Sequence, residues 1–480
     1  MKIRQLIRDT ALYGFSSAVT RVFMLILIPI FISALTVNEF GIVSLFQFYM
    51  GIGIILFLFG LDHALMREFP AADTARRRDL VSTCILFLGA SAGVSALFFL
   101  IFRNAFTALL FRDAHAPEIL VWLWLIVFGE SATLVQSVVY RAEKKADLYF
   151  RNTMVKYASL LLFSWILLKP VRAGLNGVFL AYLGSNCLYA LFSIRIWRSY
   201  VRIRFSSRIL RGLLKYGLPL LPAGLLNLFL FFADHVLIQR LMGLEAVGLY
   251  AFGYKFGAVI YYLVGALNNA WYPRLFSMKK AELEVHYHRL LVGAAWISMA
   301  VFLMVDSAFR FFHPWFVPKA YAPSVRIVTL VGLAYIVHNV ASFADCLFFY
   351  AKKVGIVPLI TGISLAVNLL MNGILIPRMG IAGAALATLA AFFAHLILMI
   401  VFLKKRNVIP LRFGETAALA AGFAVPYAAS RLIMPDAFIA RLASAAALIL
   451  LFFILSWMIS PTLRNTAASA LERIKKRRNP

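Results

Sequence analysis

Cysteines are scarce in this sequence, and their scarcity excludes two kinds of site. Only Cys84, Cys187 and Cys346 occur in 480 residues, and none belongs to a CxxC pair or to a Cys/His cluster. Disulfide frameworks and zinc sites both need such spacing. We therefore expect the three thiols to be packing residues and expect no metal site.

Charged residues are also scarce. They make up 14% of the chain, against roughly 25% in soluble domains, while 62% of the residues are hydrophobic and the mean hydropathy is +0.86. Apolar runs of about 20 residues recur from end to end, and each is long enough to cross a bilayer core as a helix. Because unpaired backbone groups are not tolerated in lipid, the sequence predicts an all-α polytopic membrane protein.

Motifs for nucleotide or metal-assisted chemistry are missing. The chain has no Walker motif, no dinucleotide fingerprint and no H-E-x-x-H. The stretch from Gly89 to Gly93 matches the G-x-S-x-G pattern, but it lies inside an apolar run and not at a strand-to-helix elbow. We therefore expect neither ATP hydrolysis nor a serine nucleophile in this chain, and no organic cofactor.

Apolar runs bounded by charge, Pro or Gly predict about fourteen spans. They lie at 11–35, 41–62, 80–102, 117–139, 152–170, 174–194, 214–239, 247–271, 288–309, 327–348, 354–376, 380–403, 414–433 and 442–459. The first run follows a basic segment, as in a signal peptide, but it is about 25 residues long and has no A-x-A cleavage pattern. We expect it to be an uncleaved span.

Basic residues outnumber acidic ones by 48 to 20, and their distribution predicts the topology. If the amino terminus is cytoplasmic, the segments on that side hold 34 Lys and Arg and the opposite loops hold 11. The remaining three, Arg21, Lys156 and Lys255, lie inside spans. This alternation follows the positive-inside rule and predicts an inner-membrane protein with both termini cytoplasmic. A basic face for nucleic acid is not indicated.

The chain repeats itself once, with a period of six spans. Val37–Gly41 before the second span corresponds to Leu244–Gly248 before the eighth, and Gly174–Val178 in the sixth corresponds to Gly380–Ala384 in the twelfth. The two halves therefore have the same membrane orientation, and the interface of such parallel repeats commonly holds a transport site. We predict a six-helix lobe at 1–198, a basic cytoplasmic linker at 199–213, a second six-helix lobe at 214–404, and two extra helices with a basic tail at 405–480.

Three stretches resemble a known family. Asn368-Leu-Leu-Met-Asn-Gly-Ile-Leu-Ile-Pro-Arg-Met-Gly-Ile-Ala-Gly-Ala-Ala-Leu-Ala-Thr388 resembles the eleventh-to-twelfth span signature of polysaccharide biosynthesis proteins, the O-antigen and exopolysaccharide flippases. Tyr13-Gly14 with Glu39-Phe40-Gly41 resembles the family's opening pattern, and Asp234 followed by Leu244–Tyr250 resembles the start of its second half. The resemblance covers about residues 8 to 405 and does not select a sugar.

The resemblance implies a superfamily shared with lipid II flippases and multidrug and toxin exporters, with two six-helix bundles, a central cavity and alternating access. The implied cargo is an oligosaccharide on undecaprenyl diphosphate, moved from the cytoplasmic to the outer leaflet for O-antigen, capsule or exopolysaccharide. Polysaccharide polymerase machinery is an implied partner.

An anionic diphosphate and a sugar need basic and hydrogen-bonding groups at membrane depth. The predicted substrate-binding residues are Arg21, Lys255, Lys156, Asn268, Asn368 and Asn372. Each also has a structural alternative: an ion pair for Arg21, a stem reaching the headgroups for the lysines, and interhelical hydrogen bonds for the amides.

Coupling to a proton or sodium gradient requires an acidic group that binds and releases the cation. Asp234, His235 and Glu130 are the candidates, and the first two are adjacent. The alternative for Asp234 is a fixed salt bridge to Arg240.

Two other functions remain open. A multidrug or small-molecule exporter on the same scaffold is expected to favour acidic over basic residues in its first lobe, whereas this chain has Arg21 and Lys156 against Glu130. An O-antigen ligase or polymerase usually carries a large external loop, and the predicted external loops are about 17 residues or shorter.

Overall fold

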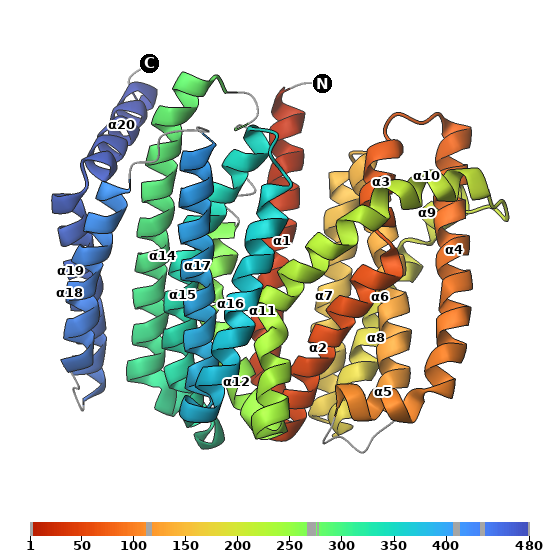
Figure 1. Cartoon of the computed structure of the whole chain (residues 1–480), viewed down its shortest axis with the longest axis horizontal. Helices are drawn as coiled ribbons and strands as arrows, with labels where there is room; N and C mark the ends of the chain where they lie inside the picture. Colours follow the sequence, from red (N-terminus) through yellow and green to blue (C-terminus); the bar gives the residue numbers. More distant parts are fainter. Residues whose placement is uncertain are drawn as a thin grey trace. The chain divides into compact units, whose positions relative to one another are not determined.

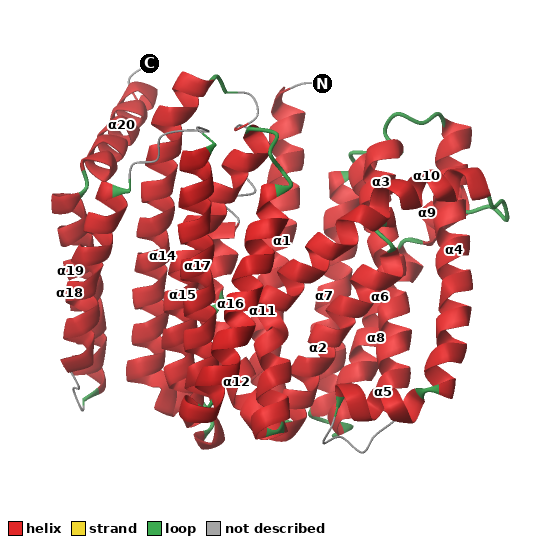
Figure 2. Ribbon diagram, viewed as in Figure 1, coloured by secondary structure: helices red, strands yellow, loops and turns green. Residues whose placement is uncertain are grey.

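The computed structural model describes residues 3–111, 118–265, 275, 278–406, 413–432 and 437–478. Within these residues all regular structure is helical and no strand occurs (Figures 1 and 2). This confirms the predicted all-α fold class.

A helix lies at each of the fourteen predicted spans. They are α1 (Ile3–Ile32), α2 (Val37–Leu58), α4 (Thr74–Ile101), α6 (Glu118–Ala142), α7 (Ala146–Leu168), α8 (Gly174–Phe192), α11 (Leu221–Met242), α12 (Leu244–Gly257), α14 (Lys280–Phe316), α15 (Val325–Tyr350), α16 (Ile356–Met379), α17 (Ile381–Lys405), α18 (Gly414–Leu432) and α19 (Phe438–Ile459). Among the described residues, 12 helical stretches have the length and hydropathy of a membrane span, and α7 and α18 fall outside that set.

Shorter elements connect or extend these helices. They are α3 (Leu61–Glu68), α5 (Arg103–Leu110), α9 (Ile194–Tyr200), α10 (Ser207–Gly217), the 3-10 helices η1 (Leu218–Leu220) and η2 (Lys319–Ser324), and the basic C-terminal helix α20 (Pro461–Arg478).

The start and the end of α2 show how local sequence sets the helix bounds. At its start the Glu39 N–H donates to Thr36 Oγ1 at 3.2 Å, and the Thr36 N–H donates to Glu39 Oε2 at 2.8 Å. This capping box supplies side-chain acceptors for two backbone N–H groups that have no partner within the helix. At its end Phe59 and Gly60 have φ angles of 52° and 69°, so the chain turns sharply into α3 at a residue without a Cβ.

The chain forms two compact units, Met1–Ala251 and Phe252–Pro480, and the boundary falls inside α12. In the first unit α7 packs against α1 and α8, while α2 packs against α6 and α11. In the second, α17 packs against α15 and α16, and the α18–α19 pair packs against α14.

Two glycines of the repeated motif make a reciprocal close approach in the first unit. A Cβ on Gly41 would lie 2.3 Å from the Leu244 carbonyl oxygen, and one on Gly248 would lie 2.1 Å from the Val37 carbonyl oxygen. The first turns of α2 and α12 therefore touch backbone to backbone. The two copies of the motif predicted from the sequence, Val37–Gly41 and Leu244–Gly248, are therefore in direct contact.

A second glycine pair lies at the other end of α2. A Cβ on Gly60 would lie 2.4 Å from the Gly217 carbonyl oxygen, and one on Gly217 would lie 2.6 Å from the Phe59 carbonyl oxygen. The segment that leads into α11 thus contacts the α2–α3 turn as closely as α12 contacts the start of α2.

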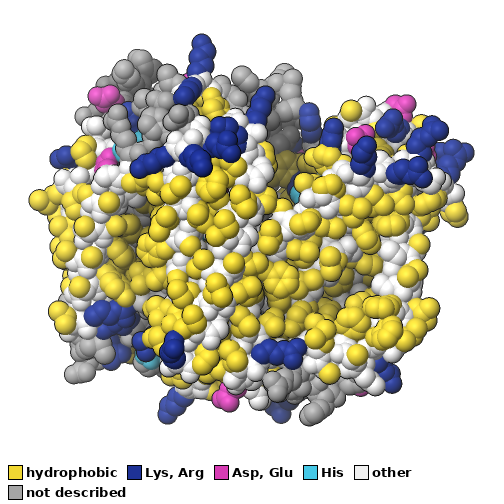
Figure 3. All heavy atoms as spheres, viewed as in Figure 1, with side chains coloured by type: hydrophobic (Ala, Val, Ile, Leu, Met, Phe, Trp, Pro, Cys, Tyr) yellow, Lys and Arg dark blue, Asp and Glu magenta, His cyan; other side chains and the backbone are white. Residues whose placement is uncertain are grey.

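Large apolar side chains cover the outer faces of the helices. Leu370, Leu450 and Ile397 are 68%, 61% and 57% exposed, an arrangement that suits contact with lipid tails. Figure 3 shows hydrophobic side chains over the middle of the helices and Lys and Arg gathered toward their ends. The chain is therefore a multi-pass membrane protein, as the sequence predicts.

Candidate functional site

A buried ion pair lies inside the first unit, between α6 and α7. Lys156 Nζ lies 2.7 Å from Glu130 Oε2 and donates a second hydrogen bond to Thr133 Oγ1 at 3.0 Å. The ammonium group also lies 5.7 Å from the centroid of the Tyr189 ring on α8. The side chain of Lys156 therefore points inward, among α6, α7 and α8, and not along its stem toward the headgroups.

The pair is strongly shielded from solvent, with side-chain exposures of 9% for Lys156 and 14% for Glu130. Two opposite charges at this depth stabilise each other, and removal of one partner leaves the other as an uncompensated buried charge. Sequence analysis named both residues for different roles, and the structure brings them together.

Two buried amides of the first unit, on α6 and α8, were not identified from the sequence. Gln136 on α6 is 1% exposed and Asn186 on α8 is 3% exposed. The amide oxygen and nitrogen of both side chains have no hydrogen-bond partner among the described residues. Asn186 packs on the helix next to Glu130, because a Cβ on Gly129 would lie 3.2 Å from Asn186 Nδ2. Buried polar atoms are nearly always bonded once ordered water is counted, so this interior is polar enough to hold water.

Asp234 and His235 on α11 form a second buried polar cluster in the first unit. The two residues are each 2% exposed, and His235 Nδ1 lies 2.8 Å from Asp234 Oδ1. The Tyr250 hydroxyl on α12 donates to the other carboxylate oxygen, Asp234 Oδ2. The His235 N–H also donates to Asp234 Oδ1 at 2.9 Å, so three hydrogen-bonding groups share one buried carboxylate. The side chain of Arg240 donates to the Leu109 carbonyl on α5.

Arg21 lies near the middle of α1 and is half-buried. It follows Ile3 by about 27 Å along the helix axis, and Ile32 lies about 16 Å further on. A charged side chain facing lipid at this depth would cost about 2.5–3.5 kcal/mol on insertion scales. Lys255, in α12 and the second unit, is also half-buried.

The amides predicted on α16 lie on one helix face and contact each other. Asn372 Nδ2 donates to Asn368 Oδ1 at 2.9 Å, and the two residues are 0% and 1% exposed. Asn368 Nδ2 and Asn372 Oδ1 have no partner among the described residues. Asn268 lies outside the described residues.

The second unit also contains a carboxylate that sequence analysis missed. Asp345 on α15 lies 3.3 Å from His395 Nε2 on α17, and the other ring nitrogen of His395 lies 3.3 Å from Ser364 Oγ on α16. The His338 ring lies 6.3 Å from the His395 ring. In the sequence Asp345 has only small or apolar neighbours and belongs to no motif. Its contact with His395, 50 positions further along the chain, could not be predicted from the sequence.

Metal ligation is not indicated by the clustering of side chains: no group of three or more His, Cys, Asp or Glu that could hold a metal occurs in the part of the chain that the structure describes. The polar clusters at depth are instead pairs, each joined by hydrogen bonds across helices or along one helix.

Long apolar helices with charged and amide pairs at depth define a polytopic membrane protein. The sequence profile of the family described as polysaccharide biosynthesis protein matches residues 34–317, more than half of the chain. The chain belongs to this family. The resemblance identified from the sequence motifs is confirmed.

Similar proteins agree with this assignment at the level of fold. The structure of the lipid II flippase MurJ in an inward closed conformation superposes with a TM-score of 0.76 at 12% identity, covering 94% of this chain and 98% of that one. A multidrug resistance MATE family transporter in an outward-facing conformation gives 0.56 at 16% identity, covering 85% and 98%. An uncharacterized membrane protein of Methanocaldococcus jannaschii is 24% identical over 390 residues, 72% of this chain and 74% of that protein.

Proposed function

We propose that this protein is a flippase that moves an oligosaccharide linked to undecaprenyl diphosphate from the cytoplasmic to the outer leaflet, for the synthesis of a surface polysaccharide. Family membership and the MurJ-like fold support a lipid-linked cargo. The observation that carries the proposal is a guanidinium, Arg21, near the middle of the Leu12–Ile32 stretch of α1, which has no other charged residue. Such a charge is costly in lipid and is retained where an anion needs it.

In this proposal Arg21 binds the diphosphate, because a guanidinium can form two parallel hydrogen bonds to phosphate oxygens. In the second unit, Lys255 is a separate candidate for contact with the anionic cargo. Amides hold the sugar hydroxyls, and Asn368 and Asn372 are suited to this because each keeps one buried polar atom without a partner in the described residues.

The glycine contacts support alternating access. Gly41 with Gly248, and Gly60 with Gly217, bring the helices together at opposite ends of α2. Backbone contacts without side chains separate and re-form without any rearrangement of rotamers. We infer that one contact holds while the other opens, so that the cargo reaches one leaflet at a time.

The coupling group in this proposal is the Asp234–His235 pair. Two titratable side chains in contact can pass a proton between them, and Tyr250 supplies a further hydroxyl. Glu130 is less suited because its charge is held by Lys156. A proton or sodium gradient would drive the cycle, with no organic cofactor.

The alternative is a cation-coupled multidrug or small-molecule exporter. The likeness to a MATE transporter favours it. The TM-score to that structure is 0.56, lower than the 0.76 to the lipid II flippase, so the fold weighs toward a lipid-linked cargo.

The test uses everted vesicles that contain the pure protein and the undecaprenyl-diphosphate oligosaccharide of the same cell, with arrival in the opposite leaflet measured by a membrane-impermeant lectin or glycosidase. We expect transfer by the wild type, a loss of at least tenfold in Arg21→Ala, and partial transfer in Arg21→Lys, which keeps the charge but loses the two-pronged geometry. Arg172→Ala, an exposed arginine in the α7–α8 turn, is the control.

Three outcomes separate the parts of the proposal. No transfer by the wild type of any such lipid rejects the flippase function, and drug efflux by the same vesicles would favour the exporter. Normal transfer by Arg21→Ala rejects the diphosphate site. Asp234→Asn should lose its response to an imposed proton or sodium gradient, and an unchanged response rejects the coupling group.

A further inference from the structure

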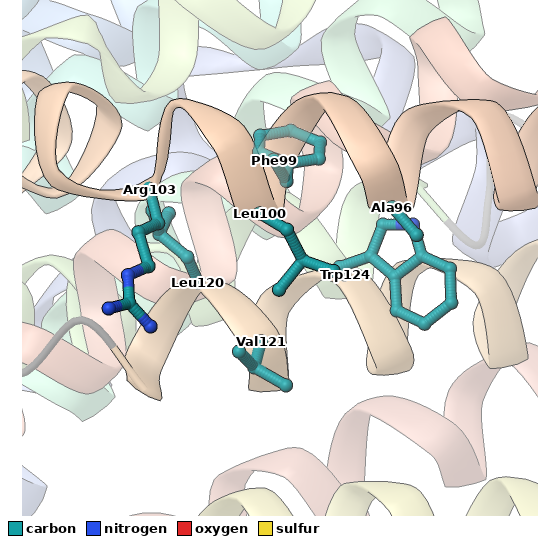
Figure 4. Close-up of a pocket in the computed structure, with 7 residues that line it drawn as sticks. All are labelled: Ala96, Phe99, Leu100, Arg103, Leu120, Val121 and Trp124. Carbon is teal, nitrogen blue, oxygen red and sulfur yellow. The ribbon is translucent and has the colours of Figure 1, made fainter.

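An apolar groove of about 120 Å³ lies between α4 and α6 in the first unit (Figure 4). Ala96, Phe99 and Leu100 form the α4 side. Leu120, Val121 and Trp124 form the α6 side. The groove is open on the outside of the helix pair, since Leu100 and Val121 are 58% and 46% exposed. A chain of methylene groups, and not a sugar, fits such a lining.

Trp124 closes one end of the groove in a fixed orientation. Its indole N–H donates to Ser95 Oγ on α4 at 3.1 Å, and its ring stacks on Phe128 with an interplanar angle of 9°. The hydrogen bond joins the two helices behind the groove. The wall is therefore part of the helix packing, and the groove does not depend on a freely rotating side chain.

Arg103 stands at the opposite end of the groove, with its guanidinium directed away from the apolar lining (Figure 4). It is exposed, and its guanidinium has no recorded hydrogen bond or ion pair with the described residues, whereas its backbone carbonyl accepts from Thr107 Oγ1. Arg103 is the first residue of α5, seven positions after Ala96. One positive charge thus lies at one end of a hydrocarbon-lined groove.

The position of Arg103 along the membrane normal matches a phosphate. Helix α4 has 28 residues and is about 42 Å long, close to the thickness of a bilayer with its headgroups. Arg76, Arg77 and Arg78 lie at its first end and Arg103 follows its last. The guanidinium therefore lies at headgroup level, while Ala96 lies within the hydrocarbon.

We propose that this groove binds an anionic glycerophospholipid, with its phosphate at Arg103 and one acyl chain between α4 and α6. A single guanidinium matches the single charge of a phosphodiester, and the short groove takes the upper part of one straight chain. The lipid braces α4, whose outward residues Val94 and Leu97 are 73% and 62% exposed, against α6. The inference is independent of the cargo proposed above.

The test is native mass spectrometry of the purified full chain after equilibration with micelles that contain equal phosphatidylglycerol and phosphatidylethanolamine. We expect wild type to retain phosphatidylglycerol preferentially, and Arg103→Gln to lower that preference about fivefold, the effect of one basic residue near an anionic headgroup. Arg172→Gln, an exposed arginine in the α7–α8 turn, should keep the wild-type preference.

A second variant tests the groove itself. Ala96→Leu places a larger apolar side chain in it and should reduce retention of both lipids, without adding a charge. The proposal is overturned if Arg103→Gln and Arg172→Gln lower the preference equally, or if neither does. Displacement of phosphatidylglycerol by undecaprenyl phosphate from the wild type but not from Arg103→Gln would assign the groove to the cargo and reject the phospholipid.

Discussion

At the scale of single residues, the chemistry of this protein depends on polar side chains that find partners on other helices. Lys156 and Glu130 are 26 positions apart in sequence and 2.7 Å apart in space. Asp345 and His395 are separated by 50 positions and lie 3.3 Å apart. In lipid such groups cannot turn to water, so the partner decides whether each charge is tolerated.

The Lys156–Glu130 pair gives the sharpest prediction at this scale. Lys156→Met leaves the Glu130 carboxylate buried without its cation, and we expect it to lower the free energy of unfolding by about 3–5 kcal/mol. The double variant Lys156→Met with Glu130→Gln should recover most of that loss, because no charge remains buried. Thermal unfolding of the detergent-solubilised variants measures both effects.

The control is Lys169→Met, at an exposed site at the end of α7 where the ammonium contacts only the Ser33 carbonyl among the recorded bonds. Its effect should stay below about 1 kcal/mol. Equal destabilisation by Lys156→Met alone and by the double variant would show that the uncompensated Glu130 charge is not the source of the loss.

At the scale of helices, glycines determine where elements approach. The first turns of α2 and α12 touch through Gly41 and Gly248, and the α2–α3 turn touches the segment before α11 through Gly60 and Gly217. Each added Cβ would fall under 3 Å from backbone, which cannot move aside as a flexible side chain does. These four positions therefore fix the spacing of three helices.

Gly41→Val tests this spacing. The added side chain would meet the Leu244 carbonyl, and we expect destabilisation of about 1–3 kcal/mol from overpacking, together with a loss of transfer. Gly212→Val is the matched control, because a Cβ there has nothing within 4 Å. Transfer is measured in the same vesicles and stability by thermal unfolding. Wild-type behaviour of Gly41→Val in both assays would rule out a role for the close contact.

At the scale of the whole molecule, the distribution of charge is the property that orients the chain. The segments predicted to be cytoplasmic hold 34 of 48 Lys and Arg. The basic segment between α9 and α10 and the basic helix α20 are predicted on that side, and the α7–α8 turn is predicted on the other. Anionic lipid and the insertion machinery act on exactly this asymmetry of short loops.

Single-cysteine labelling tests the orientation. In a variant without Cys84, Cys187 and Cys346, we expect Arg172→Cys to react with a membrane-impermeant maleimide in intact cells. Arg202→Cys, between α9 and α10, should react only after the membrane is permeabilised. Both side chains are exposed, so accessibility to the reagent depends on the side of the membrane alone. Labelling of Arg202→Cys in intact cells would reverse the predicted topology.

Sequence alone determined the properties that are local or cumulative. Each apolar run of about 20 residues predicts a helix at its position. A helix lies at each of the fourteen predicted runs. The linear motifs from Asn368 to Thr388 and near Glu39 carry the resemblance to the family. The profile match over residues 34–317, which includes the motif near Glu39, shows that the chain belongs to it. Asn368 and Asn372 could be placed on one face because four residues make about one turn.

Only the tertiary structure decided which polar groups meet. Glu130 and Lys156 had separate predicted roles, and Gln136, Asn186 and Asp345 had none, because no spacing along the chain links residues on different helices. The groove at Arg103 likewise exists only where α4 lies beside α6. Hydrophobicity determines that a segment crosses the membrane. It does not determine which helices pack together, because lipid tails are as apolar as the side chains that face them. The packing of small residues and buried polar pairs therefore selects the neighbours of each helix, and with them the sites.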